Sequence, residues 1–120
     1  MTVRLAREGA RVVVNAKKGL EDVLETIKFI EEVGGKAIFA LADVSTREEC
    51  RMLVSRAVKI YDRLDILVNN SSVGLLSPFE SLGDDIMNKQ VSADIKSIVY
   101  CSQESTPYMS GQVILLIFHR

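Results

Sequence analysis

Short apolar runs alternate with amphipathic segments of helical periodicity along the 120-residue chain, and this alternation constrains the fold more than any other feature. The predicted strands are residues 11–15, 37–42, 65–69 and 112–118, and helical patterns precede and separate them. Strands joined through helices of this length must be parallel, with right-handed crossovers and helices on both faces of the sheet. The sequence therefore predicts an α/β fold of three layers, with one parallel four-stranded sheet in a single domain spanning residues 1–120.

Local signals mark where the predicted helices begin and end. Gly9 suits the left-handed residue that follows a first helix over residues 2–8. Ser45 and Glu48 have the spacing of a capping box, which predicts that the third helix starts there. A long fourth helix is predicted from Asp84, whose carboxylate suits a helix start, to the residue before Pro107.

Composition excludes several classes of function. The formal net charge is −1 and the basic residues are scattered, so we expect no nucleic-acid partner. The longest apolar run, residues 113–118, is too short to span a bilayer, so we expect no membrane partner and a cytoplasmic protein. The single histidine excludes a multi-histidine metal cluster, and no metal site is predicted.

The two cysteines, Cys50 and Cys101, lie far apart in the sequence and form no CxxC pair. Each falls within a helical pattern, where a free cysteine behaves as a small apolar side chain. We therefore expect both to be buried and reduced, which fits a reducing cytoplasm.

Polar residues close two of the predicted strands. Asp43-Val44-Ser45 follows the second strand, and Asn69-Asn70 follows the third. In open α/β sheets, ligands bind outside the carboxyl ends of the strands. These positions are therefore the candidate site.

Four segments carry a resemblance to a known family: LAREGARVVV (5–14), GKA (35–37), ADVS (42–45) and LDILVNN (64–70). In this order and spacing they resemble the short-chain dehydrogenase/reductase family, of the 3-oxoacyl-carrier-protein reductase and glucose dehydrogenase type. The resemblance covers less than half of a complete family member. It implies a Rossmann-like core and NAD(P)-dependent oxidoreduction of a carbonyl or an alcohol.

The resemblance also implies roles on the adenosine side of a cofactor. Ala16 and Lys17 stand where the family selects the ribose of the cofactor. These positions hold a cation that could meet a 2′-phosphate and no acid that would bind a 2′-hydroxyl, a pattern that resembles an NADP preference. A turn lysine held in solvent is the alternative. Asp43 and Val44 stand at the positions that flank the adenine ring, while Asp43 could instead help to cap a helix.

On the nicotinamide side the chain departs from the family. Asn70, Ser71 and Ser72 stand where the family borders the second ribose, but Ser72 replaces a glycine and its Cβ would crowd a cofactor. Asp94 replaces an asparagine that anchors a proton-relay water, and a carboxylate cannot donate as the amide does. There is an alternative for each position. The asparagine motif at 69–70 could have a structural role only, and Asp94 could be a surface or packing residue.

These 120 residues lack the glycine-rich turn with which the family binds phosphate. They also lack the family's catalytic Ser and Tyr-x-x-x-Lys residues, since none of the three tyrosines has a lysine four positions later. We therefore expect a homologue truncated at both ends, catalytically inactive, with NADP, NAD or no cofactor bound. The alternatives are a non-enzymatic oligomerisation or interaction module and a residual adenine-nucleotide-binding module.

Loss of the family's first strand leaves the strand order 2-1-3-4, as in a flavodoxin-like sheet. In this order the first predicted strand closes up against the third. The strand at 112–118 would then form an apolar edge, which invites association. By resemblance, the long helix around Ile95 and Ile98 belongs to a subunit contact. We therefore expect a homo-oligomer.

Overall fold

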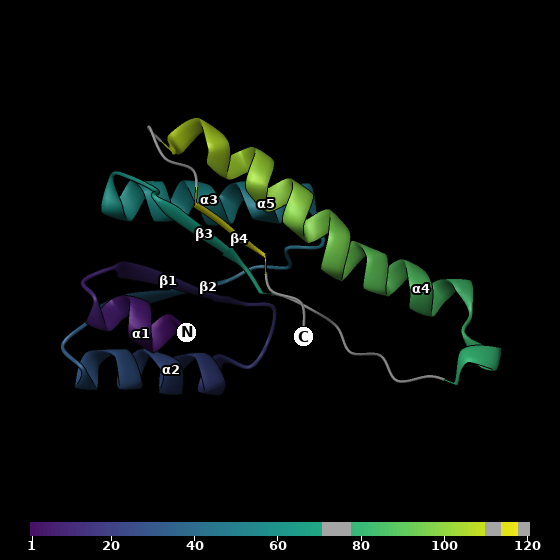
Figure 1. Ribbon diagram of the computed structural model, residues 1–120, viewed down its shortest axis with the longest axis horizontal. Helices are drawn as coiled ribbons and strands as arrows, with labels where there is room; N and C mark the ends of the chain where they lie inside the picture. The colour runs from purple at the N-terminus through teal and green to yellow at the C-terminus, as the bar shows by residue number, and fades with distance from the viewer. Residues whose placement is uncertain (71–77, 110–113, 118–120) are drawn as a thin grey trace. The chain divides into compact units, whose positions relative to one another are not determined.

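The computed structural model describes residues 1–70, 78–109 and 114–117, and it confirms the predicted alternation of helices and strands (Figure 1). In chain order the main elements are α1 (Thr2–Arg7), β1 (Arg11–Ala16), α2 (Leu20–Glu32), β2 (Lys36–Leu41), α3 (Arg47–Tyr61), β3 (Ile66–Asn69), α4 (Asp84–Val91), α5 (Ser97–Ser105) and β4 (Ile114–Ile117). Short helical turns lie at Phe79–Ser81, Ser92–Lys96 and Thr106–Tyr108.

The strands form two parallel pairs. β1 pairs with β2 from Arg11 opposite Lys36 to Ala16 opposite Leu41. β3 pairs with β4 over the four residues of each strand. Parallel pairing and these two neighbour relations match the prediction. The full order 2-1-3-4, which also requires β1 beside β3, stays a prediction.

The chain divides into two compact units, residues 1–43 and 44–120. In the first unit, α1 and α2 contact each other and also contact β1. The buried residues of this unit are Ala6, Val23, Ile30, Ala40 and Ala42. A single domain over the whole chain stays a prediction.

In the second unit, α3 packs against α5, and α5 also contacts β3. The buried faces of the two helices consist mainly of small side chains: Cys50, Val54 and Ala57 on α3, with Ser97, Cys101 and Ser105 on α5. Small side chains at steps of three and four residues allow the helix axes to approach closely.

The predicted long helix is present, but it is not regular. α4 and α5 are joined by a π-helical turn over Ser92–Lys96, which carries one more residue per turn than an α-helix. Apolar periodicity did not reveal this turn. Of the apolar residues on this helix, Val91, Ile95 and Val99 are exposed, whereas the buried positions carry serine and cysteine.

The predicted capping box at Ser45 and Glu48 is wrong by one residue. α3 begins at Arg47, with Thr46 as its N-cap, and the Thr46 hydroxyl oxygen accepts a hydrogen bond from the Glu49 backbone N–H at 3.4 Å. Thr46 and Glu49 have the same Ser/Thr-x-x-Glu spacing, so the sequence contains two overlapping capping-box motifs. Gly9, in contrast, has the predicted left-handed conformation, with φ of +96°.

Candidate functional site

The carboxyl ends of β1 and β2 are tied together by one side chain. The Asn15 amide nitrogen donates to the carbonyl oxygens of Ala40 at 3.0 Å and Ala42 at 3.2 Å. The Ala42 N–H in turn donates to the carbonyl of Ala16 at 3.1 Å. These bonds satisfy backbone acceptors at the point where the ladder ends, and they hold the residues that follow each strand next to one another.

Lys17 and Asp43 follow these two strands and form an ion pair. The Lys17 ammonium lies 2.5 Å from an Asp43 carboxylate oxygen, and the exposed fractions of the two side chains are 62% and 24%. The sequence suggested both residues, but for different parts of a cofactor. Their pairing depends on the β1–β2 register, which a linear sequence does not show.

The pairing has a chemical consequence for ligand binding. Part of the Lys17 charge is already compensated by Asp43, so a phosphate at this position must share or replace the carboxylate. Because the lysine is largely exposed, exchange of one anion for another requires little desolvation. An anion that approached Lys17 would therefore compete with the Asp43 carboxylate for it.

The remaining predicted site residues belong to the second unit. The Val44 carbonyl accepts a hydrogen bond from the Cys50 thiol at 3.2 Å, which holds the turn before α3 against that helix. Asn70 is exposed at the end of β3. Ser71 and Ser72 lie outside the described residues, so their predicted positions are not tested.

Asn69, rather than its predicted neighbour, is the buried polar residue at this strand end. Its side chain is 8% exposed, and its amide nitrogen has no hydrogen-bond partner among the described residues. Buried amide donors are almost always paired, so the partner of this one lies outside the described residues.

Asp94 lies in the middle of the π-helical turn and is half-buried. Ser97, the first residue of α5, donates its hydroxyl hydrogen to the carbonyl of Ala93 in this turn. Single π turns inside α-helices are found frequently at functional sites. Sequence reasoning missed this turn, because no residue pattern distinguishes it from the helix on either side.

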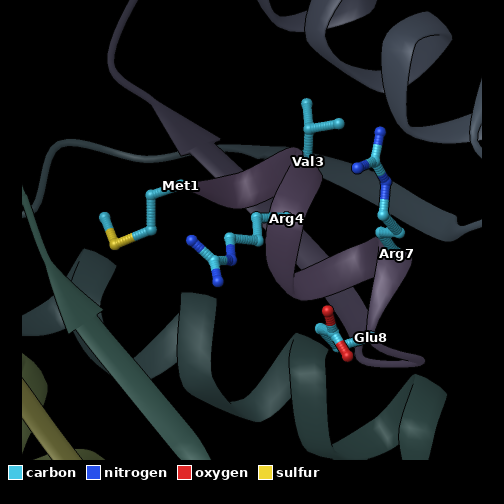
Figure 2. A pocket seen from close by; sticks show the side chains of 5 residues that line it. All are labelled: Met1, Val3, Arg4, Arg7 and Glu8. Atoms are coloured by element: carbon cyan, nitrogen blue, oxygen red, sulfur yellow. The ribbon is translucent and has the colours of Figure 1, made fainter.

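A hollow of about 440 Å³ lies on α1, away from the predicted residues. Figure 2 shows the five side chains that line it, and all come from α1 or the residues that flank it: Met1, Val3, Arg4, Arg7 and Glu8. None of them follows a strand, and they provide no nucleophile or paired acid and base. We therefore place the candidate site at the strand ends.

The described residues contain no further candidate of two kinds, a metal-ligand cluster or a membrane-spanning helix. Within residues 1–70, 78–109 and 114–117, no three histidine, cysteine, aspartate or glutamate side chains cluster as metal ligands would. None of the helices in this part of the chain has the length and apolar character needed to cross a membrane.

The fold agrees with the comparison to known families. The sequence model of the short chain dehydrogenase family matches residues 1–116, and the chain belongs to this family. An uncharacterised oxidoreductase of Methylorubrum extorquens is 35% identical over 115 residues, which are 92% of this chain and 45% of that protein. A 3beta-hydroxysteroid dehydrogenase of Mediterraneibacter gnavus is 32% identical, over 96% of this chain and 42% of that protein.

Solved structures give the same result. A short-chain dehydrogenase/reductase from Serratia marcescens superposes with a TM-score of 0.86 at 30% identity, over 94% of this chain and 47% of that one. An NADH-dependent reductase complexed with NAD superposes with a TM-score of 0.80 at 28% identity, over 89% of this chain and 45% of that one. The chain thus spans under half the length of the relatives and structures it matches.

Proposed function

We propose that this chain provides the adenosine-side half of a nicotinamide-dinucleotide site, in an oxidoreductase that acts on a carbonyl or an alcohol. The observation that carries the proposal is the Lys17–Asp43 pair at the ends of β1 and β2, held in place by Asn15. Strand ends are where open α/β sheets bind nucleotides. Family membership and the NAD complex of a related reductase support a nicotinamide cofactor.

By itself, the 120-residue chain is proposed to bind nucleotide without turning it over. Hydride transfer to a carbonyl requires a proton donor, and the sequence has no Tyr-x-x-x-Lys pair. Asp94, at the family's relay position, is proposed as a degenerate remnant of that machinery. Oxidation of NADPH that depends on an added carbonyl compound would contradict this part of the proposal.

Lys17 is proposed to favour NADP over NAD. Its ammonium is the cation that follows β1, and a 2′-phosphate can replace the Asp43 carboxylate as its partner. Asp43 therefore weakens the preference without abolishing it, because both anions compete for the same cation. Ala16, at the end of β1, leaves this position without an acid that would bind a 2′-hydroxyl.

A nucleotide titration tests this assignment. We expect NADPH to raise the unfolding temperature, and Lys17→Ala to weaken NADPH binding about tenfold, the loss of one charge-assisted bond. NADH binding should change by less than about twofold, since it has no 2′-phosphate. Asp43→Asn should strengthen NADPH binding, because the competing carboxylate charge is gone.

Lys18→Ala is the matched control, since Lys18 is the neighbouring exposed lysine of the same turn. It should leave the preference unchanged. Equal losses for NADPH and NADH in the Lys17 variant would contradict a role in selecting the 2′-phosphate. The absence of any shift with either nucleotide would favour the alternative, an interaction module without a cofactor.

A homo-oligomer is proposed from an apolar stripe on the long helix. Four residues at steps of four are exposed by 37–57%: Met87, Val91, Ile95 and Val99. Contiguous exposed apolar residues of this kind mark interaction surfaces, and the occupant proposed here is a second copy of the chain.

Light scattering at micromolar concentration should give a mass above that of one chain. Ile95→Lys should raise the dissociation constant at least about tenfold, because a charge would be buried at the centre of the contact. Met52→Lys, which changes an equally exposed apolar residue on α3, is the control and should leave the mass unchanged. A monomeric mass for the unaltered chain would contradict the oligomer.

A further inference from the structure

Cys50 and Cys101 are 51 positions apart in the sequence but their sulfur atoms lie 3.2 Å apart. Cys50 belongs to α3 and Cys101 to α5, and their exposed fractions are 0% and 4%. The Cys101 thiol donates to the Cys50 sulfur, and the Cys50 thiol donates to the Val44 carbonyl. The second unit therefore contains a buried, hydrogen-bonded pair of free thiols.

Polar contacts between the same two helices hold the pair in place. The Arg47 guanidinium donates to Gln103 at 2.7 Å and to Glu104 at 3.4 Å, and it also stacks over the Tyr100 ring at 4.5 Å. Arg51 adds a further bond to Glu104 at 3.4 Å. These contacts lie within one turn of the two cysteines along each helix and join α3 to α5 beside them.

We propose that Cys50 and Cys101 form a site of reversible oxidation, at which a peroxide converts the two thiols into a disulfide that joins α3 to α5. The sulfurs must close by about 1 Å to reach the disulfide length of about 2.05 Å, and rotation of the side chains can supply this movement. The proposal is independent of the cofactor assignment, since it uses only contacts within the second unit.

The chemistry proceeds in two balanced steps. One thiolate attacks a peroxide oxygen, the O–O bond breaks, and the sulfur becomes a sulfenic acid as hydroxide leaves. The second sulfur then attacks the first, the S–S bond forms, and the S–O bond breaks with loss of water. In total two thiols lose two hydrogens, and the peroxide is reduced to two waters. A small dithiol reverses the reaction by exchange.

Burial of the two thiols controls the rate of their oxidation. Burial and the adjacent Cys50 raise the pKa of the Cys101 thiol well above its usual range, so this sulfur stays protonated at neutral pH. Because the thiolate is the reactive form, oxidation should be slow and should accelerate as the pH rises from 7 to 9. The site would therefore respond to sustained oxidation rather than to a brief exposure.

The test is hydrogen peroxide treatment of the native chain, followed by alkylation and mass spectrometry without reduction. We expect a product of single-chain mass, without cross-links between chains, that is lighter by about 2 Da, a single cross-linked peptide pair containing Cys50 and Cys101, and full recovery after dithiothreitol. Cys50→Ser and Cys101→Ser should each abolish the loss of two hydrogens. Unmodified thiols, sulfinic acids or disulfides between chains, in place of this product, would overturn the proposal.

A second measurement separates the folded geometry from chance encounters in an unfolded chain. In a glutathione redox buffer, the equilibrium constant for the internal disulfide should be at least about tenfold larger in the native chain than in guanidinium chloride, because folding holds the sulfurs together. Equal constants under the two conditions would show that the fold does not favour the bridge, and would also overturn the proposal.

Discussion

Replacement of Ile30 by alanine is expected to lower the free energy of unfolding by about 2–5 kcal/mol, the range for loss of a large aliphatic side chain from a core. Ile30 lies on α2 and has no exposed surface. It is the largest fully buried side chain among the described residues. Urea denaturation of the two chains, followed by circular dichroism, measures the difference.

Leu24→Ala is the matched control, because Leu24 lies on the same helix with 46% of its surface exposed. It removes the same number of carbon atoms but leaves no cavity, so the loss should stay below about 1 kcal/mol. Equal losses for the two variants would contradict the burial that the structure assigns to Ile30.

Replacement of Gly35 by serine is expected to destabilise the chain by about 1–3 kcal/mol, because the site is already full. A Cβ atom at this position would lie 2.8 Å from the Ala6 Cβ and 2.9 Å from the Ile30 Cγ2. The backbone cannot move away easily, since the Gly35 N–H donates to the Ile30 carbonyl at 2.9 Å. Chemical denaturation again provides the measurement.

The same substitution at Gly83 is the control. No atom lies within 4 Å of a Cβ there, and Gly83 is the N-cap of α4, where serine is a favoured residue. Gly83→Ser should therefore be neutral or slightly stabilising. In an Ala6→Gly background, Gly35→Ser should cost less than it does alone, because one of the two clashing atoms is gone. If the two glycines tolerate serine equally, the close packing of α1 and α2 at Gly35 is wrong.

Much of the fold could be predicted because its signals are local. The apolar run of β1 depends on residues within a few positions of one another, and β1 ends within one residue of the predicted range 11–15. The start of α4 at Asp84 follows from the same kind of local chemistry. The N-cap of α3 was misplaced by one residue, to Ser45 instead of Thr46, because the two overlapping motifs have equal local merit.

The candidate site was predicted as a set of residues and not as a set of contacts. Lys17 and Asp43 were chosen separately, and only the β1–β2 register shows that they share one ion pair. Asn69 was expected only as part of a motif, whereas the structure buries it with an unpaired amide. The roles of Asn70 and Asp94 stay predictions.

The sequence by itself determined the class of fold, the parallel direction of the strands and the family, because periodicity and motif spacing are properties of nearby residues. Only the tertiary structure brought Cys50 against Cys101 and placed a π-helical turn at Asp94. The first feature joins residues distant in the chain, and the second depends on how the helix packs. Both are stabilised only after the elements have come together, so no local sequence pattern predicts them.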